Sequence, residues 1–258
     1  MLMARFINYF ADCLNRRNFI IEIGRASLIT MVASSIVLPM GCSKKMDDRI
    51  KHKKELVGYQ QTCRPVIIKL LGEENYDRLC KSSLMEYDKF SAQLPLFKDD
   101  NNKSTFYASA PFMLSHYRAL LGEFALDQKK ALDVLREITN YKVRKKSENP
   151  SLLMKFIFPR VARYDFFRRL ALKKFTYKGE KYGWATTFPP SDAYMAVDYV
   201  KCGLSDWFRD QGAPEIAPIA CEGDLIWTEL LTGLKFIRTK TIAGGDGLCD
   251  FRFVKKRV

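Results

Sequence analysis

The sequence predicts an α+β fold, in which a helical first half packs on an antiparallel sheet formed by the second half. Up to about residue 175, apolar residues recur at the three- and four-residue spacing of helices. From residue 176 onward, segments rich in Tyr, Val, Thr, Phe and Ile alternate in part, which is typical of strands. The chain has 258 residues, 47% of them hydrophobic, and is long enough to bury a sizeable core.

The first forty-two residues have the features of an export signal. Arg16 and Arg17 resemble the pair of a twin-arginine signal, and the uncharged run 26–41 that follows is too short to cross a bilayer comfortably. The run ends in "LPMGC", which resembles a lipoprotein cleavage box with Cys42 as the lipidated residue. We expect residues 1–42 to be an export signal and lipobox, and the protein to be periplasmic and lipid-anchored to a membrane. Cleavage without lipidation and a short buried or anchoring helix stay open as alternatives.

Residues 43–55, "SKKMDDRIKHKKE", are charged and have no apolar period. This composition predicts a solvated tether, and we interpret His52 as part of that tether rather than as a catalytic residue. We expect the remaining residues, 56–258, to form one α+β domain. It would be helical over 56–175 and contain the sheet over 176–258.

The helical half is expected to contain four elements before residue 175. The apolar spacing between Leu56 and Phe90 predicts two helices, which separate at Gly72. The segment "KDDNNKS", 98–104, is typical of a turn-rich linker. One long helix is expected over about 106–140 and another over 151–174. His116, on the long helix, is expected to be a packed or surface histidine.

The second half predicts the order strand, strand, helix, helix, strand, strand after residue 182. The first two strands are "YGWATTF" and "AYMAVDYVKC", and the last two are "LKFIRTKTI" and the final run that begins "CDFRF". The short helices are "LSDWFRDQG" and "CEGDLIWTELL". This order indicates an antiparallel sheet that is covered by helices.

The chain is strongly basic, with a formal charge of +14 from 43 basic and 29 acidic residues. The basic residues are spread along the whole sequence, and there is neither a zinc-finger spacing nor an aromatic run typical of RNA-binding sheets. We therefore expect no nucleic-acid partner. A small anionic substrate or an anionic membrane surface fits this charge better.

Three of the seven cysteines, Cys202, Cys221 and Cys249, lie at the ends of expected elements. Cys221 is expected to open a short helix, where the helix dipole stabilises a thiolate, and it is the best candidate nucleophile. Asp224 lies one turn later on the same side, where it could accept a proton or bind a cationic amidine. Inert buried thiols and a disulfide are the alternatives. The spacing supports a divalent metal held by the three cysteines only weakly, so no cofactor is firmly predicted.

Strand alternation separates Cys249 from Asp250 in the final strand. Cys249 is expected to face the core with Phe251, whereas Asp250 faces the opposite side. We expect Asp250 to pair across the hairpin with Arg238 or Lys240. The two neighbours are therefore predicted to have different roles.

Cys202, the stretch "FRDQGAPEIAPIACEGD" (208–224) and the stretch "FIRTKTIAGGDGLCDFRF" (236–253) together resemble the L-2-amino-thiazoline-4-carboxylic acid hydrolase family. The resemblance implies hydrolytic opening of a thiazoline ring to a carbamoyl-cysteine. A thiolate or an activated water would add to the amidine carbon, and the ring sulfur would leave.

The resemblance also implies roles for individual residues. Cys221, Asp224 and Cys249 would be catalytic, with Asp224 holding the amidinium group of the substrate. Arg238 or Lys240 would bind the substrate carboxylate, and Cys202 would contribute to substrate binding. Whether Cys221 attacks, ligates a metal or only shapes the pocket stays open. The alternative function is a non-enzymatic periplasmic lipoprotein that binds a small ligand or a metal through the same cysteines.

Overall fold

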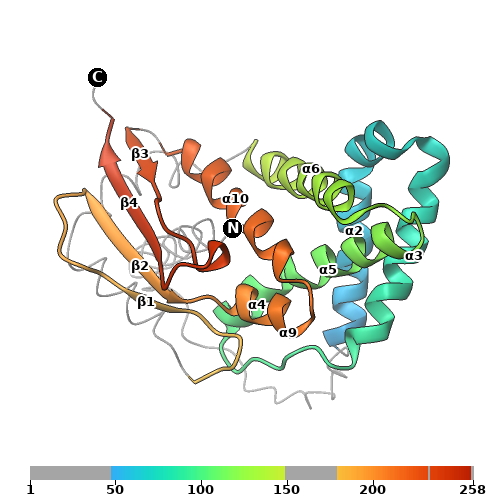
Figure 1. The fold of residues 1–258 in the computed structure, drawn as a ribbon, viewed down its shortest axis with the longest axis horizontal. Helices are drawn as coiled ribbons and strands as arrows, with labels where there is room; N and C mark the ends of the chain where they lie inside the picture. The colour runs from blue at the N-terminus through green and yellow to red at the C-terminus, as the bar shows by residue number, and fades with distance from the viewer. Residues whose placement is uncertain (1–47, 149–178, 232, 257–258) are drawn as a thin grey trace, which may run out of the picture.

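The computed structural model describes residues 48–148, 179–231 and 233–256 (Figure 1). The expected signal over 1–42, including Cys42, lies outside the described residues. The helix expected over 151–174 lies outside them as well.

The helical half is built from five helices among the described residues: α2 (Asp48–Leu71), α3 (Glu73–Ser91), α4 (Asp100–Tyr107), α5 (Ala110–Gly122) and α6 (Gln128–Ser147). Helix α3 packs against α5, and α2 packs against both α3 and α6. The predicted break between the first two helices is confirmed at Gly72, whose φ of 93° lies in the left-handed region that favours glycine.

Two predictions for this half are wrong. The segment 98–104 is mostly helical, because the Asp99 side chain accepts a hydrogen bond from the Asn102 N–H at 3.0 Å and so caps the start of α4. The single long helix is interrupted after Tyr107 and again after Gly122. The second break precedes Asp127, which accepts from the Lys130 N–H at 2.9 Å as the N-cap of α6.

The predicted tether is also wrong over residues 48–55, which form the first turns of α2. The buried residues His52, Leu56, Tyr59 and Cys63 follow one another at spacings of four, three and four, so they share one helix face. His52 is only 4% exposed, and its ring stacks on that of Tyr107 with centroids 3.7 Å apart. The apolar face of α2 therefore begins one turn earlier than the charged composition indicates.

The second half forms a four-stranded antiparallel sheet with the order β1-β2-β4-β3. Its strands and helices are β1 (Ala185–Thr187), β2 (Met195–Lys201), α9 (Gly203–Asp210), α10 (Ala217–Glu229), β3 (Leu234–Ile237) and β4 (Cys249–Lys255). The predicted element order and the α+β class are confirmed. Figure 1 shows α9 and α10 between the sheet and the helices of the first half.

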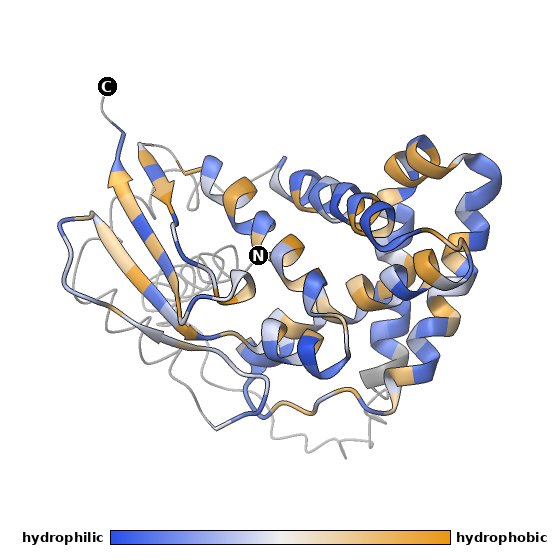
Figure 2. Ribbon diagram, viewed as in Figure 1, coloured by the Kyte–Doolittle hydropathy of each residue, from blue (hydrophilic) through white to orange (hydrophobic). Residues whose placement is uncertain are grey.

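One hydrophobic core joins the two halves. Trp207 of α9 packs edge-on against Phe106 of α4, with ring centroids 5.0 Å apart, and also contacts Phe90 of α3. In β4, Cys249 and Phe251 face this core, and Figure 2 shows the matching alternation of apolar and polar residues along the strand. The predicted orientation of Cys249 is thus confirmed. None of the described helices combines the length and the apolar character that a membrane crossing requires.

Candidate active site

The segments after β2 and along α10 bring Cys202, Cys221 and Asp224 to the wall of one small cavity. Cys202 follows the last residue of β2, and Cys221 and Asp224 lie one turn apart on α10. The cavity has a volume of about 20 Å³, which is enough for one water molecule and too little for a ring-shaped substrate. The rest of the wall consists of Thr105, Leu204, Ser205, Ala217, Ala220 and Ala243.

Cys249 is not among the residues that line this cavity. It pairs with Tyr199 of β2, and its Sγ accepts a hydrogen bond from the Ile242 N–H at 3.2 Å. A charge on Cys249 raises the pKa of both Cys202 and Cys221, so the three thiols interact electrostatically. Tyr199 belongs to the same group: burial, then the charge of Asp224, raises its pKa far above the usual value. Sequence reasoning missed Tyr199, which carries no signal beyond its place in a strand.

Asp224 and Arg238 form a buried ion pair beside the thiols. Arg238 Nη1 lies 3.4 Å from Asp224 Oδ2, and the two side chains are 9% and 6% exposed. The same nitrogen donates to the Cys221 carbonyl oxygen at 3.2 Å, and the guanidinium group lies over the Phe251 ring. Charges this deeply buried need a partner or a ligand to offset their desolvation. The site thus holds one positive and one negative group close together.

The thiols are held in their protonated form. Burial raises the pKa of Cys202 to about 12, and burial also raises the pKa values of Cys221 and Cys249. For Cys221, the neighbouring Cys202 and Asp224 raise the pKa further, while Arg238 opposes them. At neutral pH these groups are therefore poor nucleophiles.

The prediction that Cys221 opens its helix is wrong. Helix α10 begins at Ala217, because the 3₁₀ turn Pro214–Ile216 leads directly into it and Pro218 suits its first turn. Cys221 therefore lies beyond the helix start, where the macrodipole has little effect. Cys202 instead occupies the N-cap position of α9. Nearby backbone N–H groups lower the pKa of its thiol, but burial raises this pKa by more.

Asp250 holds the loop that follows β3. It accepts hydrogen bonds from the Thr239 N–H at 2.8 Å, the Thr239 hydroxyl at 2.6 Å and the Lys240 N–H at 2.6 Å. Burial alone would raise the pKa of Asp250, but these hydrogen bonds lower it. The predicted side-chain partners are wrong, since Arg238 turns to Asp224 and Lys240 contributes only its backbone. Lys240 is exposed and does not line the cavity.

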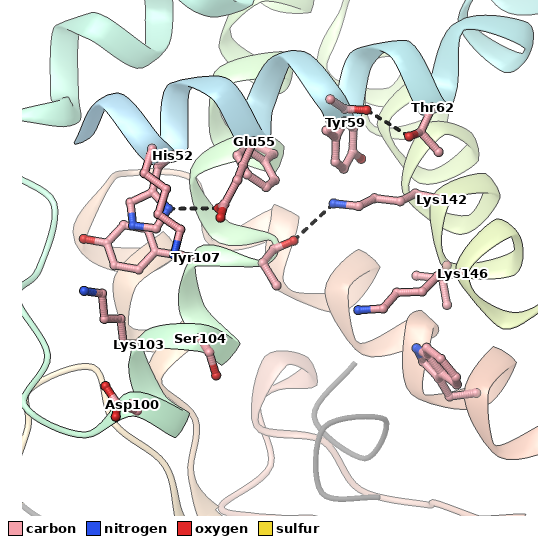
Figure 3. A pocket seen from close by; sticks show the side chains of 16 residues that line it. His52, Glu55, Tyr59, Thr62, Asp100, Lys103, Ser104, Tyr107, Lys142 and Lys146 are labelled. Carbon is pink, nitrogen blue, oxygen red and sulfur yellow. Dashed lines mark hydrogen bonds and ion pairs between the residues drawn. The ribbon is translucent and has the colours of Figure 1, made fainter. Parts of the chain in front are cut away.

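A second, much larger cavity of about 570 Å³ lies among α2, α4, α5 and α6 (Figure 3). Helix α4 contributes Thr105 to the small cavity and the preceding Ser104 to the large one. Helix α10 contributes Asp224 to the small cavity and Trp227, one turn later, to the large one. The two cavities thus flank the same two helices. His52 lines the large cavity, and the spacing of four between it and Leu56 is the sequence signal for its burial.

The described residues contain no group of three His, Cys, Asp or Glu side chains arranged to hold a metal ion. The geometry therefore gives no support to a metal site formed by Cys202, Cys221 and Cys249. Every cysteine between residues 48 and 256 for which the structure gives a position is a free thiol, so the disulfide alternative is not realised among them.

Residues 107–253 match the family model described as L-2-amino-thiazoline-4-carboxylic acid hydrolase. Because the match covers more than half of the 258 residues, the chain belongs to this family. The matched span contains all the residues of the cysteine group and the Asp224–Arg238 pair. The matched span begins at the last residue of α4, so α2 and α3 lie before it. No curated protein and no solved structure matches the chain.

Proposed function

We propose that the protein hydrolyses a small cyclic amidine that carries a carboxylate, such as L-2-amino-thiazoline-4-carboxylate, to a carbamoyl-cysteine. The family membership supports this reaction class. The observation that carries the proposal is the buried Asp224–Arg238 pair beside three thiols, all within the matched span.

The charges of the pair are complementary to those of the substrate. A thiazoline carboxylate has a cationic amidine at one end and a carboxylate at the other, so Asp224 would bind the first and Arg238 the second. Arginine binds carboxylates with two parallel hydrogen bonds, which would fix the orientation of the ring. The ring would enter by separating Asp224 from Arg238, because the cavity beside them holds only one water molecule. The substrate amidine then takes the place of Arg238 beside Asp224, and the substrate carboxylate takes the place of Asp224 beside Arg238, so neither buried residue loses its counter-charge.

The proposed reaction uses one water molecule. Asp224 accepts a proton as the water oxygen bonds to the amidine carbon, and the bond between that carbon and the ring sulfur then breaks. The protonated Asp224 returns its proton to the departing sulfur, and the hydroxyl proton of the intermediate is released to solvent as the carbonyl forms, which leaves a free thiol and a neutral urea group on the product. Atoms balance without an oxidant or a reductant. The space for one water next to Asp224 supports this route.

Attack by Cys221 is the competing route, and the raised pKa of its thiol disfavours it. The test is to incubate the purified protein with the thiazoline carboxylate and to follow carbamoyl-cysteine by mass spectrometry and the new thiol by a colorimetric reagent. We expect turnover by the wild type and its loss in Asp224→Asn. The matched control is Glu222→Gln, two residues earlier on α10, which breaks a partly exposed pair with Arg136. Absence of turnover, with or without added Zn²⁺ or Mn²⁺, would refute the proposal.

We also propose that the protein is exported and lipid-anchored at Cys42. The supporting features are the Arg16–Arg17 pair, the uncharged run and the "LPMGC" sequence. Because α2 begins at Asp48, the chain between Cys42 and the helix spans at most about 20 Å, so the domain would lie close to the membrane surface. Incorporation of a labelled fatty acid by the wild type but not by Cys42→Ala is expected. Equal labelling of both proteins would exclude this anchor.

A further inference from the structure

We propose that the cavity among α2, α4, α5 and α6 is a second ligand site, which binds a flat, ring-bearing carboxylate that also carries an O–H or N–H donor. Its volume of about 570 Å³ is within the range of small-molecule sites. Nine of its sixteen described lining residues precede residue 107, where the family match begins. The site is thus mostly built from a part of the chain that the family model does not cover, and it goes beyond the proposed hydrolysis.

The first argument is an unpaired acceptor on His52. His52 Nδ1 lies 3.0 Å from Glu55 Oε2, and because an ionised carboxylate only accepts, Nδ1 carries the hydrogen. In a neutral imidazole, Nε2 is then an acceptor, and this atom is buried without a hydrogen-bond partner. The hydroxyl of Tyr59, two turns along α2, is likewise buried without a hydrogen bond of normal geometry. Both residues line the cavity, so a ligand whose donor displaces the atoms that cover His52 Nε2 or the Tyr59 hydroxyl would supply the missing hydrogen bond.

The second argument is charge. The described wall of the cavity contains four lysines and two acidic residues: Lys51, Lys103, Lys142, Lys146, Glu55 and Asp100. Figure 3 shows the amino groups of Lys142 and Lys146 directed from α6 toward the side of the cavity where α2 and α4 lie. Glu55 already accepts from His52, and Lys142 already donates to the Ala108 carbonyl oxygen at 3.3 Å. With four lysines against two acidic residues, the wall still carries a net positive charge, which favours an anion.

The third argument is the aromatic lining. The His52 and Tyr107 rings are stacked with an interplanar angle of 3°, and Phe112 and Trp227 also line the cavity. Lys142 Nζ lies 3.9 Å from the centroid of the Tyr59 ring, so a positive charge and a flat apolar surface are adjacent. A planar ring with a carboxylate matches this combination, whereas a small inorganic anion would leave the aromatic surfaces unused.

The test is calorimetric titration of the full chain with 4-hydroxybenzoate, which has the ring, the carboxylate and a hydroxyl donor. Two close analogues are the controls: 4-hydroxybenzamide lacks the charge, and benzoate lacks the donor. We expect saturable one-to-one binding of 4-hydroxybenzoate and binding of each analogue about tenfold weaker or worse. If the wild type shows no saturable binding, or the neutral amide binds equally well, the proposal is overturned. Inorganic phosphate that binds as tightly as 4-hydroxybenzoate would overturn it too, because the ring would then contribute nothing.

Variants locate the site. Lys142→Met combined with Lys146→Met should weaken binding about tenfold or more, whereas Lys130→Met should leave it within about twofold. Lys130 is the matched control, since it lies on the same helix, is exposed and pairs with Asp127 outside the cavity. His52→Phe retains a flat ring and should remove the preference for 4-hydroxybenzoate over benzoate, with thermal unfolding as a check on folding. An equal loss in Lys130→Met, or an unchanged preference in folded His52→Phe, would overturn the assignment.

The experiment also separates this site from hydrolysis. Asp224→Asn lacks the proposed base but leaves the large cavity intact, so it should bind 4-hydroxybenzoate like the wild type. Binding without turnover would leave this inference standing while the hydrolase proposal fails. Turnover without binding of 4-hydroxybenzoate would leave the hydrolase proposal standing and overturn this inference.

Discussion

The two cavities beside α4 and α10 differ in almost every physical property. The small one has room for a single water molecule, with two thiols and the Asp224 carboxylate in its wall, and Arg238 pairs with that carboxylate. The large one has about 570 Å³ of space, with lysines and aromatic rings in its wall. Tight burial suits a reaction that needs strong local electrostatics, whereas an open basic cavity suits selection of an anion. The two proposals thus place the reaction and the binding of a larger anion in different cavities of this fold.

The largest effect should follow from Asp224→Asn in the small cavity. Loss of a general base lowers kcat by about 10²- to 10⁴-fold. The change also leaves Arg238 without its buried partner, which costs about 3–5 kcal/mol of the free energy of unfolding. Steady-state kinetics and urea unfolding measure the two effects.

The two effects can be separated with a second variant. Asp224→Asn combined with Arg238→Met removes both charges, and it should recover much of the stability without activity. Glu222→Gln should cost about 1 kcal/mol or less, because its pair with Arg136 is partly exposed. If the Glu222 variant lost as much activity as the Asp224 variant, α10 would matter only as a scaffold.

The next effect concerns access to the small cavity. Ala243, in the loop that Asp250 holds, lines the cavity and faces the space for one water. Ala243→Leu should fill this space and lower kcat/KM by about 10² or more, because the side chain then displaces the attacking water. Binding of 4-hydroxybenzoate in the large cavity should not change. Unaltered kinetics in a folded Ala243→Leu variant would place the reaction elsewhere.

The sequence predicted the sheet most accurately and helix α2 least accurately. The period-two pattern of "CDFRF" correctly gave the inward face of Cys249 and Phe251, because alternation depends only on backbone geometry. The charged residues around His52 concealed a helix face, although the spacing of four between His52 and Leu56 places both on it. The Asp224–Arg238 pair joins residues on a helix and after a strand, so its formation depends on tertiary packing that local patterns do not contain.

The pH dependence of stability should also differ between the two halves. Burial lowers the pKa of His116 on α5 to about 4, against an ordinary value near 6.5. Between these two pH values His116 is protonated in the unfolded chain but not in the folded chain. The free energy of unfolding therefore falls as pH drops from about 6.5 to 4, by up to about 3 kcal/mol. Replacing His116 with Gln should flatten this slope in urea unfolding measured at several pH values. An unchanged slope would show that folding does not lower the pKa of His116.

The raised pKa values of the thiols should instead make the protein less stable at high pH. The pKa of Cys202 is raised to about 12, so above about pH 9 the unfolded chain releases a proton that the folded chain keeps. Stability should therefore fall as pH rises from about 9 toward 12, and Cys202→Ala should reduce the slope. Buried tyrosines such as Tyr199 contribute in the same direction, so the informative quantity is the difference between wild type and variant.

The smallest effect is predicted for Cys221→Ser, and it discriminates most sharply between the two chemical routes. If water attacks, the serine hydroxyl fills nearly the same space, and kcat should fall by less than about tenfold, the loss expected from one altered contact of about 1 kcal/mol. If Cys221 attacks, kcat should fall by orders of magnitude, because a buried serine has an even less accessible anion. Cys63→Ser, which alters a buried thiol that donates to the Ile138 carbonyl in the helical half, is the control for the general cost of such a change. A covalent adduct on Cys221 in quenched wild-type protein would decide for attack by the thiol, and its absence together with a nearly active serine variant would decide for water.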